Sequence, residues 1–315
     1  MPDVSIGFAT CAEHRHLIAD DLILARALEK RGAKVVPVVW TETPPQSLAC
    51  DLLVLRSVWD YHLQPERFLD WLTAVAQRTR VVNAPEIVRW NMDKHYLKDI
   101  AAAGFAVPKT AFLERGSLER RSLERRPQVV LIELMRSAGL TAAVIKPTIS
   151  ASAFETYKIE AAQAGGFGAK LNALLQDRSM MVQELVPEIA TSGEWSLIFI
   201  AKASARDAFA GHECTHAVNK LPRRGDFRVQ EEHGGLHTLA SPPAAAVQMA
   251  EAILGRFAPQ AVYCRADIVM RPQGPVLMEL ELIEPLLHFE LAPEAAEKMA
   301  EILARTSGKC GGQSQ

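Results

Sequence analysis

The first third of the chain alternates short apolar runs with a segment of helical period. Leu24 and Leu28 fall on one face of that segment, which Gly32 ends, and β-rich apolar runs stand on both sides of it. This order of strand, helix and strand is typical of the βαβ unit that begins a parallel sheet. The pattern predicts strands at residues 4–8, 33–40 and 51–55, and helices from residue 20 to 32 and from 65 to 77.

The pattern changes near Pro85, where a new subdomain is predicted to begin. A helix is expected from Asn91 to Ala103, with Asp93 and Lys94 at its start and a glycine after its end. Beyond it, the apolar residues indicate a mixed α+β body that closes with a helix. We expect strands at 143–146, 180–184 and 195–201, helices at 169–176, 242–257 and 294–305, and a hairpin of 262–270 with 276–282.

These elements predict an α/β protein in which an N-terminal parallel βαβ domain precedes two α+β subdomains. A chain of 315 residues is long for one compact unit, which agrees with this division. The predicted boundaries are 1–88 for the N-terminal, substrate-side domain, 89–185 for the central subdomain, 186–305 for the C-terminal subdomain, and 306–315 for a flexible tail. The SLER repeat within 117–125 is expected to be a solvated insertion.

Composition argues against several classes of partner. Hydrophobic residues make up 49% of the chain and the formal net charge is −2, which gives no electrostatic reason to expect nucleic acid or a membrane surface. The five cysteines are scattered without a CxxC pair, so they indicate reduced thiols and give no sign of zinc. The N-terminus lacks a basic segment followed by an apolar one. We therefore expect a cytoplasmic protein with a small-molecule ligand.

A dinucleotide-binding domain begins with a similar strand and helix, but its first turn needs glycines so that the backbone can approach a pyrophosphate. Here that turn reads ATCAEHRH. A nucleotide site is therefore expected elsewhere in the chain.

The predicted hairpin near residue 270 gathers several charges. Strand alternation puts Arg265 and Asp267 on one face of its first strand, and Glu279 and Glu281 on one face of its second. Three carboxylates side by side repel one another, and a hard cation such as Mg²⁺ would compensate them. Two amphipathic strands with charged outer faces would give the same pattern, so the hairpin alone leaves both interpretations open.

Several single residues are candidates for a nucleotide site. Lys146 ends an apolar run, where its ammonium can meet a phosphate, and Lys94 stands at a helix start with free backbone donors. The backbone after Gln183 and the side chain of Glu184 can bind an adenine edge, and Glu194 can bind a ribose hydroxyl. Each residue also has an ordinary structural explanation, as a surface lysine or a solvated acid at a strand end.

The order of these residues resembles the ATP-grasp superfamily, to which glutathione synthetase and D-alanine–D-alanine ligase belong. The resemblance runs from about Val88 to Leu303, and the βαβ segment before it is similar to the substrate-side domain of such enzymes. The segments RSVWDY, RWNMDK, ELVPEIATSGEWS, KLPRRGDFRVQ and MELELIEP resemble the branch that contains the enzyme closing the cycloserine ring.

The resemblance implies two α+β subdomains that clasp ATP, and a role for each matching residue. Lysines would hold the phosphates, strand-end residues the nucleoside, and hairpin carboxylates Mg²⁺. In this assignment Lys94, Lys146 and Lys220 bind phosphates, Glu184 and Val186 adenine, Glu194 ribose, and Asp267, Glu279 and Glu281 the metal, while Arg265 and Lys220 act in catalysis.

Two departures from the superfamily pattern stand out. The segment after Lys146 reads PTISASAFET and has no glycine, although the loop that covers the phosphates is often glycine-rich. Glu281 stands where asparagine is frequent, which adds a negative charge to the predicted metal site.

The resemblance predicts an ATP-dependent carbon–nitrogen ligase of amino-acid or antibiotic biosynthesis that forms an amide-type bond through an acyl phosphate and releases ADP and phosphate. Ring closure within one molecule, a phosphotransferase and a non-catalytic nucleotide-binding module stay open as alternatives. The expected partners are a small-molecule carboxylate and an amine, and a homodimer stays open. Substrate-side candidates, each with a structural alternative, are Arg56, Asp60 and Tyr61 in the N-terminal domain and Arg223, Arg224, Arg228 and His233 later in the chain.

Overall fold

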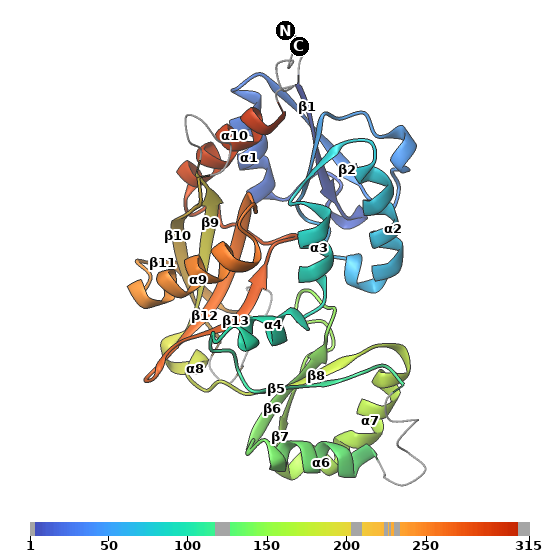
Figure 1. Ribbon diagram of the computed structural model, residues 1–315, viewed down its shortest axis with the longest axis vertical. Coiled ribbons are helices and arrows are strands. Elements are labelled where there is room, and N and C mark those ends of the chain that lie inside the picture. The colour runs from blue at the N-terminus through green and yellow to red at the C-terminus, as the bar shows by residue number, and fades with distance from the viewer. Residues whose placement is uncertain are drawn as a thin grey trace.

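The computed structural model describes residues 4–116, 127–202, 210–223, 226, 228–229 and 234–307. In these residues the chain forms one parallel and two antiparallel sheets (Figure 1). The α/β class and the succession of a parallel unit and two mixed units are therefore confirmed. The SLER repeat and residues 308–315 of the predicted tail lie outside the described residues.

The N-terminal domain is a four-stranded parallel sheet in the order β2-β1-β3-β4. All four residues of β3 are buried, as expected for a parallel strand that is covered on both faces. The predicted βαβ start is correct, and only the three-residue strand β4 is not predicted by the pattern. The elements are β1 (Val4–Thr10), α1 (Ala19–Glu29), β2 (Ala33–Val39), β3 (Leu52–Leu55), α2 (Pro65–Ala76) and β4 (Arg80–Val82).

The predicted helix at 91–103 is wrong in its extent, because two shorter helices occupy this region. Helix α3 (Pro85–Met92) ends before Lys94, and α4 (Tyr96–Ala102) begins after it. The backbone N–H of Lys94 donates to the carbonyl of Thr148 at 2.8 Å, and the Asp93 carboxylate accepts the backbone N–H of His95 at 3.0 Å. Tertiary bonding thus replaces helical bonding at the break and fixes Lys94 beside the central sheet.

The central subdomain is an antiparallel sheet in the order β5-β8-β6-β7. Its two helices pack together, and Leu131 and Met135 of α6 share a core with Leu171 and Leu175 of α7. Strand β8 has the predicted bounds, whereas β5, β7 and α6 are not predicted by the pattern. The elements are β5 (Thr110–Leu113), α6 (Pro127–Ser137), β6 (Ala142–Pro147), β7 (Tyr157–Glu160), α7 (Ala164–Asp177) and β8 (Met180–Glu184).

The C-terminal sheet is antiparallel, in the order β11-β10-β9-β12-β13. Ala266, Ile268 and Leu280 are buried in one core with Ala250 and Leu254 of α9, so the alternate residues of the hairpin face away from that helix. The predicted hairpin is confirmed. The elements are α8 (Ile189–Ser192), β9 (Glu194–Ala201), β10 (His212–Leu221), β11 (Leu236–Leu239), α9 (Ala244–Phe257), β12 (Tyr263–Arg271) and β13 (Gly274–Glu281).

The closing helix α10 (Pro293–Ser307) returns to the N-terminal domain. Met299 and Leu303 share a core with Leu28 of α1, and the two helices lie side by side in Figure 1. Lys30 and Glu297 also form an ion pair between them at 3.1 Å. The start of β1 and the end of α10 consequently lie at the same end of the molecule (Figure 1). The predicted domain boundaries stay predictions.

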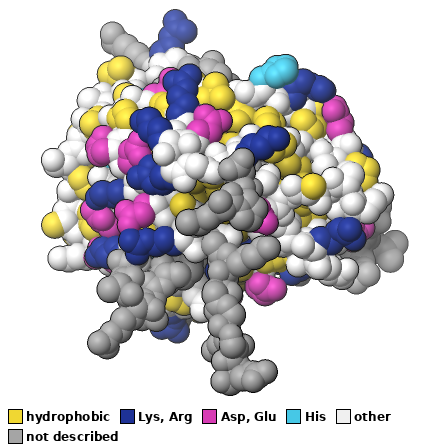
Figure 2. Space-filling model, turned by 90° about the horizontal axis from the view of Figure 1, so that it is seen from above, with side chains coloured by type: hydrophobic (Ala, Val, Ile, Leu, Met, Phe, Trp, Pro, Cys, Tyr) yellow, Lys and Arg dark blue, Asp and Glu magenta, His cyan; other side chains and the backbone are white. Residues whose placement is uncertain are grey.

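Seen from that end, acidic and basic side chains are interspersed among hydrophobic ones (Figure 2). This face therefore shows no large field of one sign, in agreement with the net charge of −2. Among the residues that the structure describes, no helix combines the length and the apolar character needed to cross a bilayer. The cytoplasmic location and the homodimer stay predictions.

Candidate active site

A cavity of about 500 Å³ opens where the three units meet. Trp59 and Tyr61 line it from the N-terminal domain, Lys146 and Glu184 from the central sheet, and the β12–β13 hairpin from the C-terminal sheet. Its volume lies in the range of small-molecule sites. The cavity is therefore the candidate active site.

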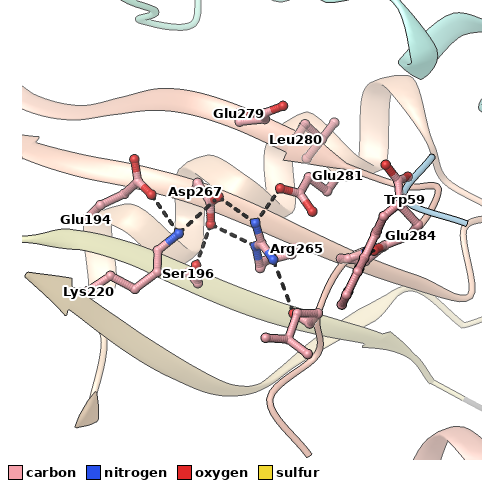
Figure 3. A network of polar contacts seen from close by, with 12 residues as sticks. Trp59, Glu194, Ser196, Lys220, Arg265, Asp267, Glu279, Leu280, Glu281 and Glu284 are labelled. Atoms are coloured by element: carbon pink, nitrogen blue, oxygen red, sulfur yellow. Dashed lines mark hydrogen bonds and ion pairs between the residues drawn. The ribbon is translucent and has the colours of Figure 1, made fainter. Parts of the chain in front are cut away.

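The hairpin brings its charged residues into register. Arg265 lies opposite Glu281 and Asp267 opposite Glu279, and a β-bulge follows Asp267. Figure 3 shows Arg265 between the carboxylates of Asp267 and Glu281, with Glu279 farther along β13. The convergence of charges predicted from strand alternation is thus present in the fold.

Arg265 binds two carboxylates and the backbone. Its guanidinium donates to both oxygens of Asp267 at 3.1 Å, to Glu281, and to the carbonyl of Leu286 at 3.3 Å. Burial alone would raise the pKa of Asp267, but Arg265 and Lys220 hold it well below its usual range. Asp267 is therefore a carboxylate at neutral pH, and Arg265 is held in one orientation by a bidentate contact.

Lys220 on β10 reaches the same group of charges from the neighbouring strands. Its ammonium lies 2.6 Å from Glu194 and 3.3 Å from Asp267, and only about 7% of its side chain is exposed. The hydroxyl of Ser196 donates to Asp267 at 2.5 Å. Glu194, Lys220 and Asp267 thus form a continuous line of charges across β10, β9 and β12 (Figure 3).

Two lysines approach the site from the central side. The Lys94 ammonium lies 3.0 Å from Glu279 and donates to the carbonyl of Ser150 at 2.8 Å. Lys146 lines the cavity from β6, and burial lowers the pKa of its ammonium although Glu279 opposes that shift. Within the described part of the chain, Lys146 has no ion-pair partner. The structure therefore brings these two lysines to the wall of the same cavity as Lys220, the third lysine predicted to bind phosphate.

The three hairpin carboxylates lie close enough to affect one another electrostatically. Burial raises the pKa of Glu281 to about 7, because Asp267 and Glu279 offset the opposing charge of Arg265. Among the described residues, no three His, Cys, Asp or Glu side chains lie in an arrangement that could by itself hold a metal ion. The predicted ligands are instead engaged by Arg265, Lys94 and Lys220, so their metal role stays a prediction.

The predicted adenine contacts lie at the end of β8. Val186 is buried and lines the cavity, while the Glu184 carboxylate lies 2.8 Å from Arg271 of β12 and accepts the backbone N–H of Lys109 at 3.2 Å. Burial alone would raise the pKa of Glu184, but these two partners lower it. The Glu184 side chain therefore links the central and C-terminal sheets, and its backbone borders the cavity.

Only some of the described substrate-side candidates lie at the cavity. Tyr61 and Arg228 line the cavity, and Arg228 forms a bidentate pair with Asp226. Arg56, Asp60 and Arg223 do not line it. Arg56 is buried against Asp21 at 2.7 Å, Asp60 accepts the indole N–H of Trp40 at 2.6 Å, and Arg223 is exposed. Arg224 and His233 lie outside the described residues.

Solved structures share this arrangement of sheets. D-cycloserine synthetase DcsG superposes with a TM-score of 0.79 at 21% identity over 96% of this chain and 99% of that one. An ATP-grasp RimK domain protein from Sphaerobacter thermophilus superposes with a TM-score of 0.64 at 17% identity, over 96% of this chain and 98% of that one. The chain has the ATP-grasp fold. D-alanine–D-alanine ligase from Bacillus anthracis, solved in complex with ATP, superposes with a TM-score of 0.62 at 14% identity, over 96% of this chain and 97% of that one.

Sequence comparison gives the same relationship. Residues 6–83 match the family described as the N-terminal domain of D-cycloserine synthetase DcsG. The cycloserine biosynthesis protein DcsG of Streptomyces lavendulae is 27% identical over 264 residues, which cover 81% of this chain and 82% of that protein. The resemblance to ATP-grasp ligases and to their cycloserine branch is thus confirmed.

The ATP-grasp cavity also contains residues that the sequence patterns did not single out. Trp59, Glu284 and His288 line it, and Glu284 and His288 are less than a tenth exposed. Trp59 and Glu284 belong to the segments RSVWDY and MELELIEP, so their position in matched segments was the available signal. His288 follows the hairpin in an irregular connection, with a φ of 54°, where periodicity gives no information.

Proposed function

We propose that this protein is an ATP-dependent carboxylate–amine ligase. The observation that supports it is a single cavity in which Lys94, Lys146, Lys220 and Arg265 converge on the carboxylates of the β12–β13 hairpin. Such a density of opposite charges in a partly enclosed site suits the transfer of a phosphoryl group, where positioning and electrostatic stabilisation dominate catalysis.

ATP fits the residues of the cavity wall. We assign the phosphates to Lys94, Lys146 and Lys220, adenine to Glu184 and Val186, and ribose to Glu194, all of which border the same space. The ammonium of Lys146 is available to a phosphate, because no described acid pairs with it. The ATP complex of D-alanine–D-alanine ligase, which shares this fold, supports the choice of nucleotide.

The hairpin also fits Mg²⁺ by the chemistry of its donors. Asp267, Glu279 and Glu281 offer hard carboxylate oxygens, and burial, with the neighbouring charges of Asp267 and Glu279, raises the pKa of Glu281 to about 7. Magnesium commonly takes one or two protein carboxylates together with substrate phosphates, so the absence of a complete set of ligands among the described residues is compatible with it. When bound there, Mg²⁺ would neutralise phosphate charge.

Arg265 and Lys220 are the residues of the chain that we assign to the phosphoryl-transfer step. Arg265, held by Asp267 and Glu281, and Lys220, held by Glu194, stabilise negative charge on the phosphoryl group as it moves to the substrate carboxylate. The resulting acyl phosphate has a good leaving group. An amine attacks its carbonyl carbon, the C–O bond to phosphate breaks, the amine nitrogen loses a proton, and an amide-type bond remains.

A specific observation favours the intramolecular form of this reaction. The likeness to DcsG includes the N-terminal domain, which contributes Trp59 and Tyr61 to the cavity wall. Cycloserine contains a ring amide, and hydrolysis of that amide would give 2-amino-3-(aminooxy)propanoate. We propose this amino acid as the first test substrate, since holding its carboxylate and aminooxy group together would supply much of the rate advantage.

The test follows the carboxylate oxygen. Wild-type protein, ATP, Mg²⁺ and ¹⁸O-carboxylate 2-amino-3-(aminooxy)propanoate are incubated together, beside a panel of amino acids and amines. The proposal expects ADP, one ¹⁸O in the released phosphate, and a product lighter by one water. AMP with pyrophosphate, or unlabelled phosphate, would reject acyl-phosphate chemistry, and a stable phosphorylated product would indicate a phosphotransferase.

A further inference from the structure

Glu284 occupies the part of the cavity nearest the N-terminal domain. It lies three residues beyond β13, and its backbone carbonyl accepts the indole N–H of Trp59 at 3.0 Å (Figure 3). Its side chain is 8% exposed and lines the cavity. The N-terminal domain therefore fixes the backbone of Glu284 at the wall of the site.

The Glu284 carboxylate differs from the other acids of the wall in its partners. Among the residues that the structure describes, each of the others has a basic side chain in ion-pair contact, and Glu284 has none. Its described neighbour is Tyr61, a buried residue whose hydroxyl interacts with the carboxylate. The other acids are Glu184, Glu194, Asp226, Asp267, Glu279 and Glu281.

A buried carboxylate without a cation is costly, because desolvation is not repaid by an opposite charge. Retaining one beside Tyr61 is reasonable if a ligand supplies the missing charge. We propose, on the basis of the proposed ligase function, that Glu284 and Tyr61 bind the ammonium group of the substrate. The substrate is then an amino acid with a free amino group, and an acid without that group, or with it acylated, is a poor substrate.

The electrostatics of the site agree with this assignment. Burial, together with the charge of Glu281, raises the pKa of Glu284 to about 8, while Lys94 and Tyr61 only partly oppose this. An ammonium group placed against Glu284 would favour its ionised form. Arg265 lies on the other side of Glu281, where Glu281 and the carbonyl of Leu286 hold its guanidinium at the cavity wall. Its positive charge suits the carboxylate or acyl phosphate end of the same molecule.

The experiment compares two probes that differ only in the amino group. Binding of 2-amino-3-(aminooxy)propanoate and of 3-(aminooxy)propanoate is measured by calorimetry with Mg²⁺ and ADP present, for wild type, Glu284→Gln and Tyr61→Phe. Glu290→Gln removes the same charge from an exposed position on the same segment and serves as the matched control. ATP affinity and its Mg²⁺ dependence are measured on every variant.

We expect wild type and Glu290→Gln to prefer the amino probe by about 10- to 100-fold, the range for a hydrogen bond to a charged group. Glu284→Gln should lose that preference and Tyr61→Phe part of it, with ATP affinity unchanged. Equal binding of the two probes by wild type, or no binding of either, would overturn the proposal. So would a Glu284→Gln variant that keeps the preference or that changes only the Mg²⁺ requirement.

The two hypotheses fail in different ways. A wild-type protein that transfers ¹⁸O to phosphate but shows no amino-group preference would remove the Glu284 site and leave the ligase. A protein that keeps the Glu284-dependent preference but makes no labelled phosphate would remove the ligase chemistry and leave the ammonium site.

Discussion

Arg56 and Arg265 each contact two carboxylates, but only Arg265 borders the cavity. Arg56 is 1% exposed and lies between Asp21 at 2.7 Å and Asp20 at 3.8 Å. Arg265 lies between Asp267 and Glu281 on the cavity wall. Each group thus consists of one arginine and two carboxylates, but their surroundings differ. Protein surrounds the Arg56 group, whereas the Arg265 group borders an open cavity.

The partners beyond the carboxylates explain the difference. Asp20 accepts the backbone N–H groups of Leu287 and Phe289, and Arg56 donates to the carbonyl of Pro285 at 3.3 Å. The Arg56 group therefore fixes the connection that carries Glu284 and His288. The Arg265 group ends in carboxylates that face the cavity, where a ligand can reach them. Charge composition alone does not distinguish a positioning network from a reacting one.

The largest expected effect comes from breaking the buried group. Arg56→Met leaves Asp20 and Asp21 without their cation, and should lower the free energy of unfolding by about 3–5 kcal/mol. Urea denaturation measures this, with Arg26→Met, exposed on α1, as the control. A stable Arg56→Met protein that instead loses substrate affinity would make Arg56 a binding residue after all.

Asp267→Asn should have the next largest effect, and on activity instead of stability. It keeps the shape of the side chain but weakens the hold on Arg265 and Lys220 and removes a metal-ligand charge, so turnover should fall by about 10²–10³-fold. Steady-state ADP release and a melting curve measure the two properties. Asp70→Asn, exposed on α2, controls for the charge change, and unchanged turnover at saturating Mg²⁺ would contradict the assignment.

Lys146→Ala should act on nucleotide binding more than on folding. Loss of this cavity-lining cation should weaken ATP binding by about 10- to 100-fold, the value of one charge-assisted contact. Calorimetry with ATP gives the affinity, and Lys34→Ala, exposed on β2, is the control. Wild-type affinity with normal turnover would return Lys146 to the class of structural lysines.

Glu284→Gln, which should lose the amino-group preference described above, should in addition be stabilising. Folding raises the pKa of Glu284 to about 8 through burial and Glu281, so its contribution to stability is present at low pH and is lost as pH rises through this value. Glutamine does not ionise, so the melting temperature of the variant should exceed that of wild type more at pH 8.5 than at pH 5, by about 2–4 °C per kcal/mol of penalty removed. Differential scanning fluorimetry without ligands measures this, and a gap that shrinks with pH would contradict it.

The comparison of the two arginines also shows what the sequence could reveal. The hairpin charges were predictable because β12 and β13 alternate buried residues such as Ala266 and Leu280 with charged ones, which determines the face of each side chain. Arg56 was not interpretable in this way, since its partners are distant in sequence and meet it only after folding.

The sequence pattern gave a wrong helix at Lys94 and missed some cavity residues and short strands, each for a local structural reason. Lys94 does not begin a helix, because a carbonyl from Thr148 takes its backbone N–H, and no propensity encodes that contact. Glu284 and His288 lie after the last strand, where the period of two ends and side-chain direction depends on the irregular backbone. Short strands such as β4 and β5 carry too few residues for a periodic signal.

The packing of α10 on α1 has a consequence for synthesis on the ribosome. About 210 residues separate the end of β4 from the start of α10. At typical elongation rates, roughly 10–40 s pass before that helix can cover its place. During this time the apolar surface around Leu28 that Met299 and Leu303 will bury faces water, although every strand of its own sheet has been made. Completion of the first domain thus has to wait for the synthesis of α10, and stalling before residue 293 would leave a nascent chain that chaperones can recognise.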